Sequence, residues 1–213
     1  MVPAISRRQV LRLAAAAAAA FPLVTQDSAS ALVGRPRDTI EAWADTIVPG
    51  ERRFPGDRVV LGATPGPGAV QAGAWDLYRD PDVGLAPLLP AIAALLDTQA
   101  VAYLATHPGT HTVGVPSFVA LDLEGRTAVA QRLLRGSGPD QLLWYALAAL
   151  AMLAFHTAAH LDTATAVAQG HPGLAWLGFP EPDADGVWRF PTFSYRRVLA
   201  STHPGTTASG QPG

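Results

Sequence analysis

The sequence predicts an all-α protein, built as a small helical bundle around one long central helix. Apolar residues recur at helical spacing in several segments that Gly and Pro separate. Strand signals are scarce, because only Val187–Phe193 resembles a short strand. The longest segment without a helix breaker covers about residues 139–169, from Pro139 in a first helical turn to the stop at Gly170. We therefore expect this segment to form one helix and the other helices to pack around it.

The central segment carries no formal charge between Asp140 and Asp162, and its apolar residues lie on every side of a helix. Such a helix is either wrapped by other helices or buried in lipid. A spanning helix needs ~20 apolar residues, so Leu142–Leu161 qualifies by length and leaves a membrane-tethered component as an alternative. Its many alanines, and the cost of placing His156 and His160 inside a bilayer, favour the core of a soluble bundle.

Shorter helices are expected before and after this segment. Asp38 and Glu41 have the spacing of a capping box at the start of a first helix. A loop rich in Gly and Pro then covers residues 50–67, and loops of this length are usually functional or disordered. After Gly170 the chain is rich in aromatic residues and Pro without helical spacing, which predicts an irregular C-terminal segment. The further predicted helices are Gly68–Arg79, Ala86–Thr106 and Leu123–Leu134.

Residues 1–31 are predicted to be a twin-arginine signal peptide. Arg7 and Arg8 form the arginine pair, an uncharged Ala-rich run follows, and a small-x-small site predicts cleavage after Ala31. A single helical domain over 32–200 and a disordered tail over 201–213 complete the expected organisation. The twin-arginine (Tat) pathway exports folded proteins. The chain is therefore expected in the periplasm, the cell-wall space or the medium, with membrane association only through a complex.

Composition excludes several classes of protein. The chain has no Cys, so it cannot form disulfides, Fe–S clusters or thiolate zinc sites. A formal net charge of −2 gives no support to nucleic-acid binding. A Gly-rich dinucleotide fingerprint and a Walker loop are both absent from the sequence. We expect no cofactor in this chain, although its export signal is of a kind that often serves cofactor proteins.

Two histidines are the candidate metal ligands. His156 and His160 would lie i, i+4 on one face of the predicted central helix, a spacing that can place two imidazoles on one metal ion. Thr157, rather than Glu, follows His156, which excludes the zincin motif. Histidines hydrogen-bonded within a core are the alternative. No Ser stands in a nucleophile-elbow context, so we expect no catalytic residue, and a metal protein or enzyme using this pair is the alternative function.

The strongest functional candidate in the sequence is a partner-binding surface. The Pro-rich segment after Gly170 is crowded with aromatic residues and cannot form a core of its own. It either packs back on the bundle or presents these side chains to a partner, where Trp, Tyr and Arg carry much of the binding energy. Arginines of the 50–67 loop would suit the rim of such an interface. The expected interface residues are Trp176, Leu177, Phe179, Pro180, Trp188, Phe190, Tyr195, Arg52 and Arg53.

Several segments, taken in order, resemble the gluconate 2-dehydrogenase subunit 3 family. Asp45–Gly50 is similar to the family's D-x-I-I-P signature, and a Gly-rich loop then leads to the helix predicted at Gly68–Tyr78. Phe118–Arg126 looks like the F-x-x-L-x-x-x-x-R approach to the fourth helix, and Trp176–Pro180 looks like L-G-Y-P-G. The chain departs from the family at Glu181, where Gly is usual. With the twin-arginine leader, the resemblance covers most of the mature chain.

The resemblance implies a small, non-catalytic subunit. In that family it accompanies a large FAD-dependent subunit of the glucose–methanol–choline oxidoreductase type, which performs the chemistry. The small subunit supplies the Tat signal for both chains and helps its partner to mature, and a cytochrome subunit can complete the complex. The expected partners are therefore the FAD-dependent large subunit and the Tat translocase, with FAD held by the large subunit.

Overall fold

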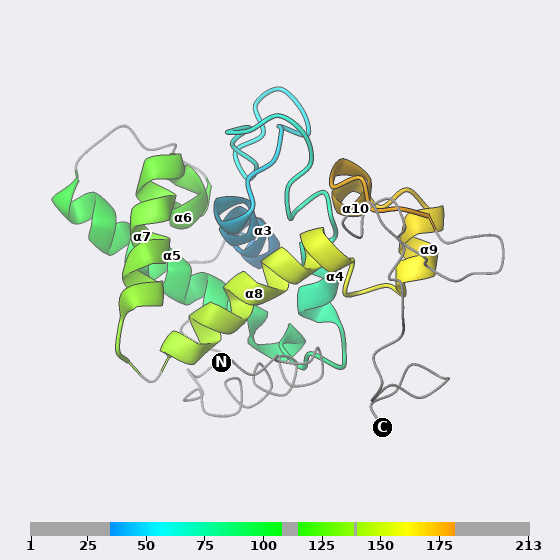
Figure 1. Ribbon diagram of the computed structural model, residues 1–213. Coiled ribbons are helices and arrows are strands. Elements are labelled where there is room, and N and C mark those ends of the chain that lie inside the picture. Colours follow the sequence, from blue (N-terminus) through cyan, green and yellow to red (C-terminus); the bar gives the residue numbers. More distant parts are fainter. Residues whose placement is uncertain (1–34, 108–114, 139, 182–213) are drawn as a thin grey trace, which may run out of the picture. The chain divides into compact units, whose positions relative to one another are not determined.

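The computed structural model describes residues 35–107, 115–138 and 140–181, and all regular secondary structure within these ranges is helical (Figure 1). The all-α prediction is confirmed. The chain divides into two compact units, Met1–Gly178 and Phe179–Gly213, and every helix described below belongs to the first. The predicted signal peptide, the tail and the strand-like Val187–Phe193 lie outside the described residues.

Helix α3 (Pro36–Ile47) is in contact with α4, α5, α6, α7 and α8. Every residue from Thr39 to Asp45 is buried, so this short helix is enclosed on all sides along its middle. Pro36 occupies the first turn, where its missing N–H breaks no helical hydrogen bond. The predicted capping box is wrong, because the helix begins before Asp38 and Glu41 pairs with arginine side chains instead.

Helix α8 (Gln141–Thr157) corresponds to the first half of the predicted central helix. The prediction of one helix over 139–169 is wrong in extent, because Ala158 adopts a left-handed conformation (φ 47°) that ends the helix. Asp162 then accepts a hydrogen bond from the Thr165 N–H at 2.9 Å and caps a separate helix, α9 (Thr163–Ala168). The continuous Leu142–Leu161 helix required for a membrane span is therefore not formed.

The other predicted helices differ in how well their bounds agree with the structure. The 3₁₀ turn η1 (Ala86–Leu88) continues into α5 (Leu89–Thr106), and α7 (Leu123–Arg135) begins at the predicted residue. Helix α4 (Ala74–Arg79) is shorter than predicted, since turns precede it and Gly73 has a positive φ of 81°. A short helix, α6 (Ser117–Ala120), was not predicted.

One apolar helix passes a test of length and composition for a membrane span. Among the described residues this helix is Ala86–Thr106. Its most apolar stretch of 18 residues has a mean hydropathy of 1.5, and a third of that stretch is buried in the protein. Core helices of soluble proteins pass the same test.

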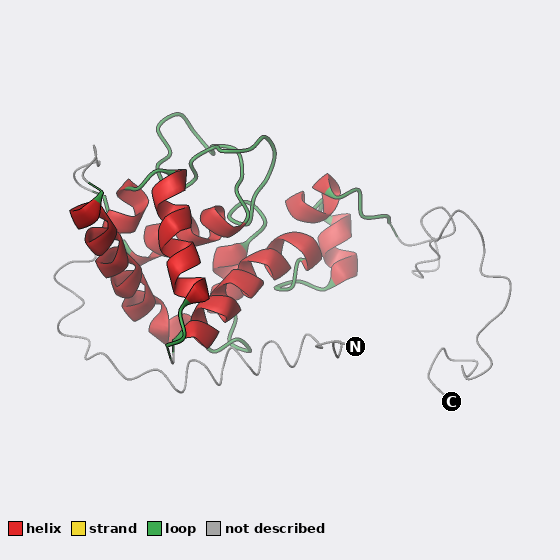
Figure 2. Ribbon diagram, turned by 60° about the vertical axis from the view of Figure 1, so that its left-hand side comes forward, coloured by secondary structure: helices red, strands yellow, loops and turns green. Residues whose placement is uncertain are grey.

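Three aromatic side chains form the centre of the core. The ring centroid of Trp43 lies 5.6 Å from that of Trp144 and 6.5 Å from that of Phe118, which joins α3 to α8 and α6. The buried Tyr78 hydroxyl of α4 donates a hydrogen bond to the Leu147 carbonyl at 2.9 Å. Figure 2 shows that the helices cross one another rather than lying parallel, and α3 is labelled among them in Figure 1.

Part of the segment predicted to be irregular is helical. Helix α10 (Pro172–Trp176) follows His171, whose Nδ1 accepts the Leu174 N–H at 3.3 Å. The other ring nitrogen, Nε2, lies 3.0 Å from the Ala72 carbonyl oxygen, so this buried histidine anchors α10 to the turn before α4. Gly173 packs on the backbone of α8 at Phe155, where a Cβ would overlap it.

Candidate functional site

A long loop without regular secondary structure, residues 50–68, is closed at its base by close backbone packing (Figure 1). Gly50 and Gly68 touch so closely that a Cβ on either would overlap the backbone of the other. The Glu51 N–H donates to the Gly66 carbonyl at 2.7 Å. The loop therefore leaves and rejoins the bundle at one point, and its interior must be held by other contacts.

Asp45, on α3, holds the loop from inside the bundle. Its Oδ1 accepts the Gly50 N–H at 3.2 Å, and its Oδ2 accepts the Leu61 N–H at 3.0 Å. The carboxylate is buried, and its Oδ2 lies 3.7 Å from Nη1 of the fully buried Arg126. Burial raises the pKa of Asp45, and the two N–H donors and Arg126 oppose the rise. One carboxylate thus fixes the beginning and the middle of the loop.

Arg126, on α7, holds the loop through its carbonyl groups. Its Nη1 donates to Val59 O at 2.6 Å, and its Nη2 donates to Val119 O at 2.8 Å and also to Arg58 O. Burial lowers the pKa of Arg126 to about 10 although Asp45 opposes the change, so the guanidinium is charged at neutral pH. Its Nε is buried without a hydrogen-bond partner among the described residues. The side chain is used for structure, since its charge and most of its donors are directed at the loop and at α6.

A second ion-pair cluster supports the first half of the loop. Arg53 donates from Nε to Asp57 Oδ2 at 2.8 Å and from Nη1 to Glu41 Oε2 at 2.8 Å. Asp57 also accepts the backbone N–H groups of Val59 and Val60. Burial alone would raise the pKa of Asp57, but the hydrogen bonds from Arg53 and Val60 outweigh it and the pKa is lowered. Three carboxylates therefore hold the loop in one conformation. Asp45 and Glu41 belong to α3, and Asp57 belongs to the loop itself.

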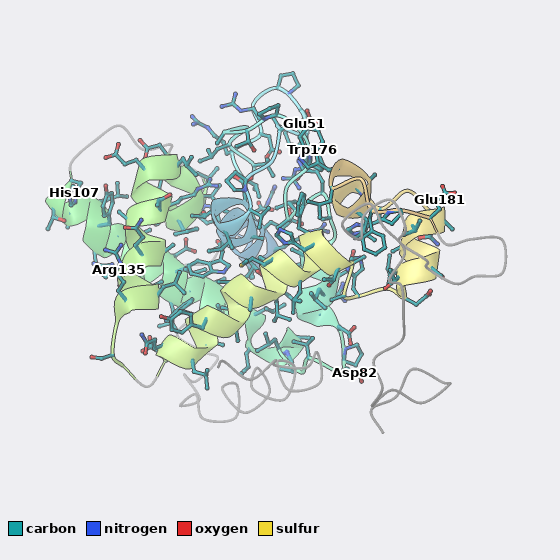
Figure 3. All side chains as sticks on the ribbon, viewed as in Figure 1. Glu51, Asp82, His107, Arg135, Trp176 and Glu181 are labelled. Atoms are coloured by element: carbon teal, nitrogen blue, oxygen red, sulfur yellow. The ribbon has the colours of Figure 1, made fainter. Side chains whose placement is uncertain are left out.

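Trp176, at the end of α10, lies against the 50–68 loop at Gly66. Gly66 has a φ of 84°, and a Cβ on it would lie 2.6 Å from the indole ring. Figure 3 shows Trp176 close to Glu51, whose N–H is bonded to Gly66. The indole nevertheless remains 58% exposed. The structure therefore brings the loop and the first part of the C-terminal segment together on one surface.

We call Arg52, Phe54, Trp176 and Leu177 the loop surface. All four are exposed, and the Arg52 side chain is placed by a hydrogen bond from its Nε to Leu61 O at 3.0 Å. Arg52, Trp176 and Leu177 are among the interface residues expected from the sequence. Arg53 is instead used inside the loop, since it pairs with two buried carboxylates. Phe54 was missed, although an aromatic residue between Arg and Pro in a long loop is the available signal.

The structure does not place the remaining expected interface residues relative to this surface. Phe179 and Pro180 belong to the second unit. Trp188, Phe190 and Tyr195 lie outside the described residues. Their expected role stays a prediction.

The two histidines that were candidate metal ligands do not lie on one continuous helix. His156 is exposed at the end of α8, with its Nδ1 2.8 Å from Met152 O, whereas His160 lies beyond the end of the helix at Thr157. The centroid of the His160 ring is instead 5.7 Å from that of His171. Metal binding by the pair stays a prediction, now without the helical spacing that suggested it. Within the described ranges, no group of three His, Asp or Glu side chains could hold a metal ion.

Comparison with known proteins identifies a family but no relative of known activity. A search of curated proteins and a search of solved structures returned no match. A family model described as a family of unknown function, DUF5987, matches residues 35–213. The match includes the whole described helical bundle, the 50–68 loop and the chain beyond α10. The chain therefore belongs to the DUF5987 family.

Proposed function

We propose that this chain is a non-catalytic small subunit that binds an FAD-dependent oxidoreductase of the glucose–methanol–choline type. In this proposal it carries its partner through the Tat pathway and helps it to mature, while FAD is bound by the partner. The starting point is the resemblance of Asp45–Gly50, Phe118–Arg126 and Trp176–Pro180 to gluconate 2-dehydrogenase subunit 3.

The single observation that carries the proposal is the ion pair between Asp45 and Arg126. These residues come from the first two of those segments, and they meet inside the bundle to hold the 50–68 loop. Trp176, from the third, lies against the same loop at Gly66. The residues on which the resemblance rests thus build one surface element, which is what a binding subunit requires.

The contacts that the buried charged side chains make also support a binding role over a catalytic one. Buried ionisable groups with shifted pKa values often mark active sites, but structural ion pairs shift pKa values too. Here Asp45, Asp57 and Arg126 are directed at backbone groups or at one another. The pKa shifts of Asp45 and Arg126 follow from burial, and that of Asp57 from hydrogen bonds of Arg53 and Val60 that outweigh burial, so a catalytic role is not needed to explain them.

The loop surface has the composition of an interface centre. Trp, Phe and Arg are enriched at the energetic centres of protein–protein interfaces. Trp176 and Phe54 are both more than half exposed, whereas Trp and Phe side chains are on average well buried. A partner would remove them from water without any rearrangement of the loop.

Purification from the native host tests the proposal. The exported chain is captured through an affinity tag, and the visible spectrum and the intact masses of the eluate are recorded. A flavin absorption band, together with a stoichiometric larger chain, is the expected result. A colourless chain without a larger partner would contradict it, and bound metal in that chain would move the assignment to the histidines.

A further inference from the structure

The charged side chains of the 50–68 loop are divided between its buried and its exposed parts. Its carboxylate Asp57 is 1% exposed, and the two carboxylates of α3 that support the loop, Glu41 and Asp45, are 3% and 1% exposed. Arg52 and Arg58, in contrast, are exposed. The acidic groups that hold the loop are therefore withdrawn from solvent, whereas two of its basic groups remain accessible to a partner.

The loop does not neutralise these two arginines. Arg53, the third arginine of the loop, pairs at 2.8 Å with two of the buried carboxylates. The other charged residues of the loop, Glu51, Arg52 and Arg58, form no ion pair with any residue that the structure describes. The unpaired charges of the loop are thus two positive and one negative, although the whole chain has a formal net charge of −2.

Both exposed arginines belong to a part of the loop that is already fixed. The Nε of Arg52 donates to Leu61 O at 3.0 Å, and its side chain packs on Gly62, where a Cβ would lie 2.6 Å from its Cγ. The carbonyl of Arg58 accepts a hydrogen bond from the buried Arg126. A partner therefore meets positive charges on a preorganised backbone, and less conformational entropy is lost when it binds.

The number of positive charges distinguishes between kinds of anionic partner. A DNA-binding protein that contacts about 6–10 phosphates needs a comparable number of basic side chains, and clusters that bind anionic lipid contain about 4–8 Lys or Arg. Two unpaired arginines in a loop that also exposes Phe54 fall short of both. They suit a protein surface with a few carboxylates, because the Arg guanidinium pairs with a carboxylate through two parallel N–H groups.

We infer that the loop surface, together with Arg58, binds an acidic patch of the partner protein, in which Asp or Glu carboxylates pair with Arg52 and Arg58. The inference rests on the proposed function and adds to it the chemistry of the partner's contact surface. Charge complementarity of this kind increases the rate of association and selects the correct partner.

Charge reversal at the two arginines tests the inference. The variant Arg52→Glu/Arg58→Glu is compared with Arg132→Glu/Arg135→Glu, which changes the net charge equally at exposed positions of α7. The control is matched further, because Arg132, like Arg52, donates to a backbone carbonyl, that of Gln99 at 3.2 Å. Figure 3 shows Arg135 well away from the loop.

Tagged chains are purified from the native host, and the flavin-to-chain ratio is measured after washing in about 0.1 M and about 1 M salt, where charges are screened over about 10 Å and about 3 Å. In the lower salt, Arg52→Glu/Arg58→Glu is expected to retain at least about tenfold less flavin than the wild type and the control, since like charges then face each other. The difference should shrink in the higher salt, and all three chains should have similar thermal midpoints.

The other outcomes separate this inference from the proposed function. Equal ratios for the wild type and Arg52→Glu/Arg58→Glu would overturn the acidic contact and leave the flavoprotein partner in place. A loss that higher salt does not reduce would also overturn it, because the substitutions would then act by something other than charge. Absence of flavin from the wild type would overturn the proposed function and this inference with it. Binding of the wild-type chain to vesicles of equal parts phosphatidylglycerol and phosphatidylcholine, lost only in Arg52→Glu/Arg58→Glu, would assign the arginines to a membrane instead.

Discussion

Asp45 and Arg126 lie 3.7 Å apart, between carboxylate Oδ2 and guanidinium Nη1, and both side chains are almost completely shielded from solvent. Asp45 belongs to α3 and Arg126 to α7, so the two residues are far apart in the sequence. Together they form hydrogen bonds with the backbone at Gly50, Val59 and Leu61. A surface loop is thereby fixed by charges placed beneath it.

Asp45→Ala is expected to destabilise the protein by about 3–5 kcal/mol, because it leaves the buried Arg126 charge without compensation. Two backbone N–H groups also lose their acceptor. Urea unfolding monitored by circular dichroism measures the change in the free energy of unfolding. Asp76→Ala, at an exposed position of α4, is the control and should change it little. A loss at Asp45 no larger than that at Asp76 would show that the pair does not hold the loop.

Arg126→Met is expected to be strongly destabilising by itself, since it removes the donors to three carbonyl groups. Because Asp45 and Arg126 share one network, their effects should not add. In a double-mutant cycle with Asp45→Asn, the coupling is expected to lie between about 0.5 and 3 kcal/mol. Additive losses in the four urea unfolding curves would mean that the two residues act independently.

The acid dependence of stability should reveal the role of Asp57. Its pKa in the folded protein lies below the ordinary value of 3.8, so the folded state binds fewer protons than the unfolded state between those two values. The stability that Asp57 contributes is present above pH 3.8 and is lost as the pH falls through its lowered pKa. Asp57→Asn should therefore flatten the rise of stability with pH in that window, measured by urea unfolding at a series of pH values.

Asp45 should give the opposite sign in the same experiment. Burial raises its pKa in the folded state, so the folded state binds more protons than the unfolded state just above pH 3.8. Its contribution to stability falls as the pH rises through that window, and Asp45→Asn should make the overall rise with pH steeper. A change of slope in the same direction for both variants would contradict these assignments.

Gly66→Ala should displace Trp176 from the loop. The substitution places a Cβ against the indole ring and also forces a non-Gly residue to adopt a φ of 84°. Gly84→Ala is a matched control, because Gly84 has a similar φ of 72° and open space around it. Both variants should lose about 1–2 kcal/mol from backbone strain, but only Gly66→Ala should change the iodide quenching of tryptophan fluorescence. Equal quenching in both variants would argue against the contact.

A helix was predicted well where its apolar spacing and its ends are visible in a short stretch of sequence. The apolar spacing of α5 is visible in one short stretch, and α5 and α7 begin and end close to the predicted residues. The cap of α7, Asp122, whose side chain accepts the Gly125 N–H, was not identified from the sequence. The end of α8 was missed because Ala158, a good helix former, adopts a left-handed conformation that its sequence does not signal. The packing of Gly173 on the Phe155 backbone joins residues of two different helices, and a local pattern does not reveal such a contact.

The sequence predicted which kinds of residue form the candidate site, but not the buried contacts that hold them in place. Arg52, Trp176 and Leu177 were selected because aromatic residues and Arg in irregular segments suit interfaces, and in the structure all three are exposed and Trp176 lies against the loop that carries Arg52. The burial of Arg126 could not be foreseen, because a charged residue on an amphipathic helix is exposed by default. Its position follows from Asp45 and the carbonyl groups of Arg58 and Val59, which are distant in sequence, and from the nearby Val119 carbonyl.

The most direct test of the proposed function compares the flavin content of three purifications from the native host. The tagged wild-type chain, the double variant Trp176→Ser/Leu177→Ser and the control Val101→Ser are captured under the same conditions; Val101 is 56% exposed, close to the 58% of Trp176. The account predicts equal flavin-to-chain ratios for the wild type and the control, and at least about a tenfold lower ratio for the double variant, since loss of two central anchors costs more than about 1.4 kcal/mol. An undiminished ratio in the double variant would show that the partner binds elsewhere, and the absence of flavin from all three would contradict the proposed function itself.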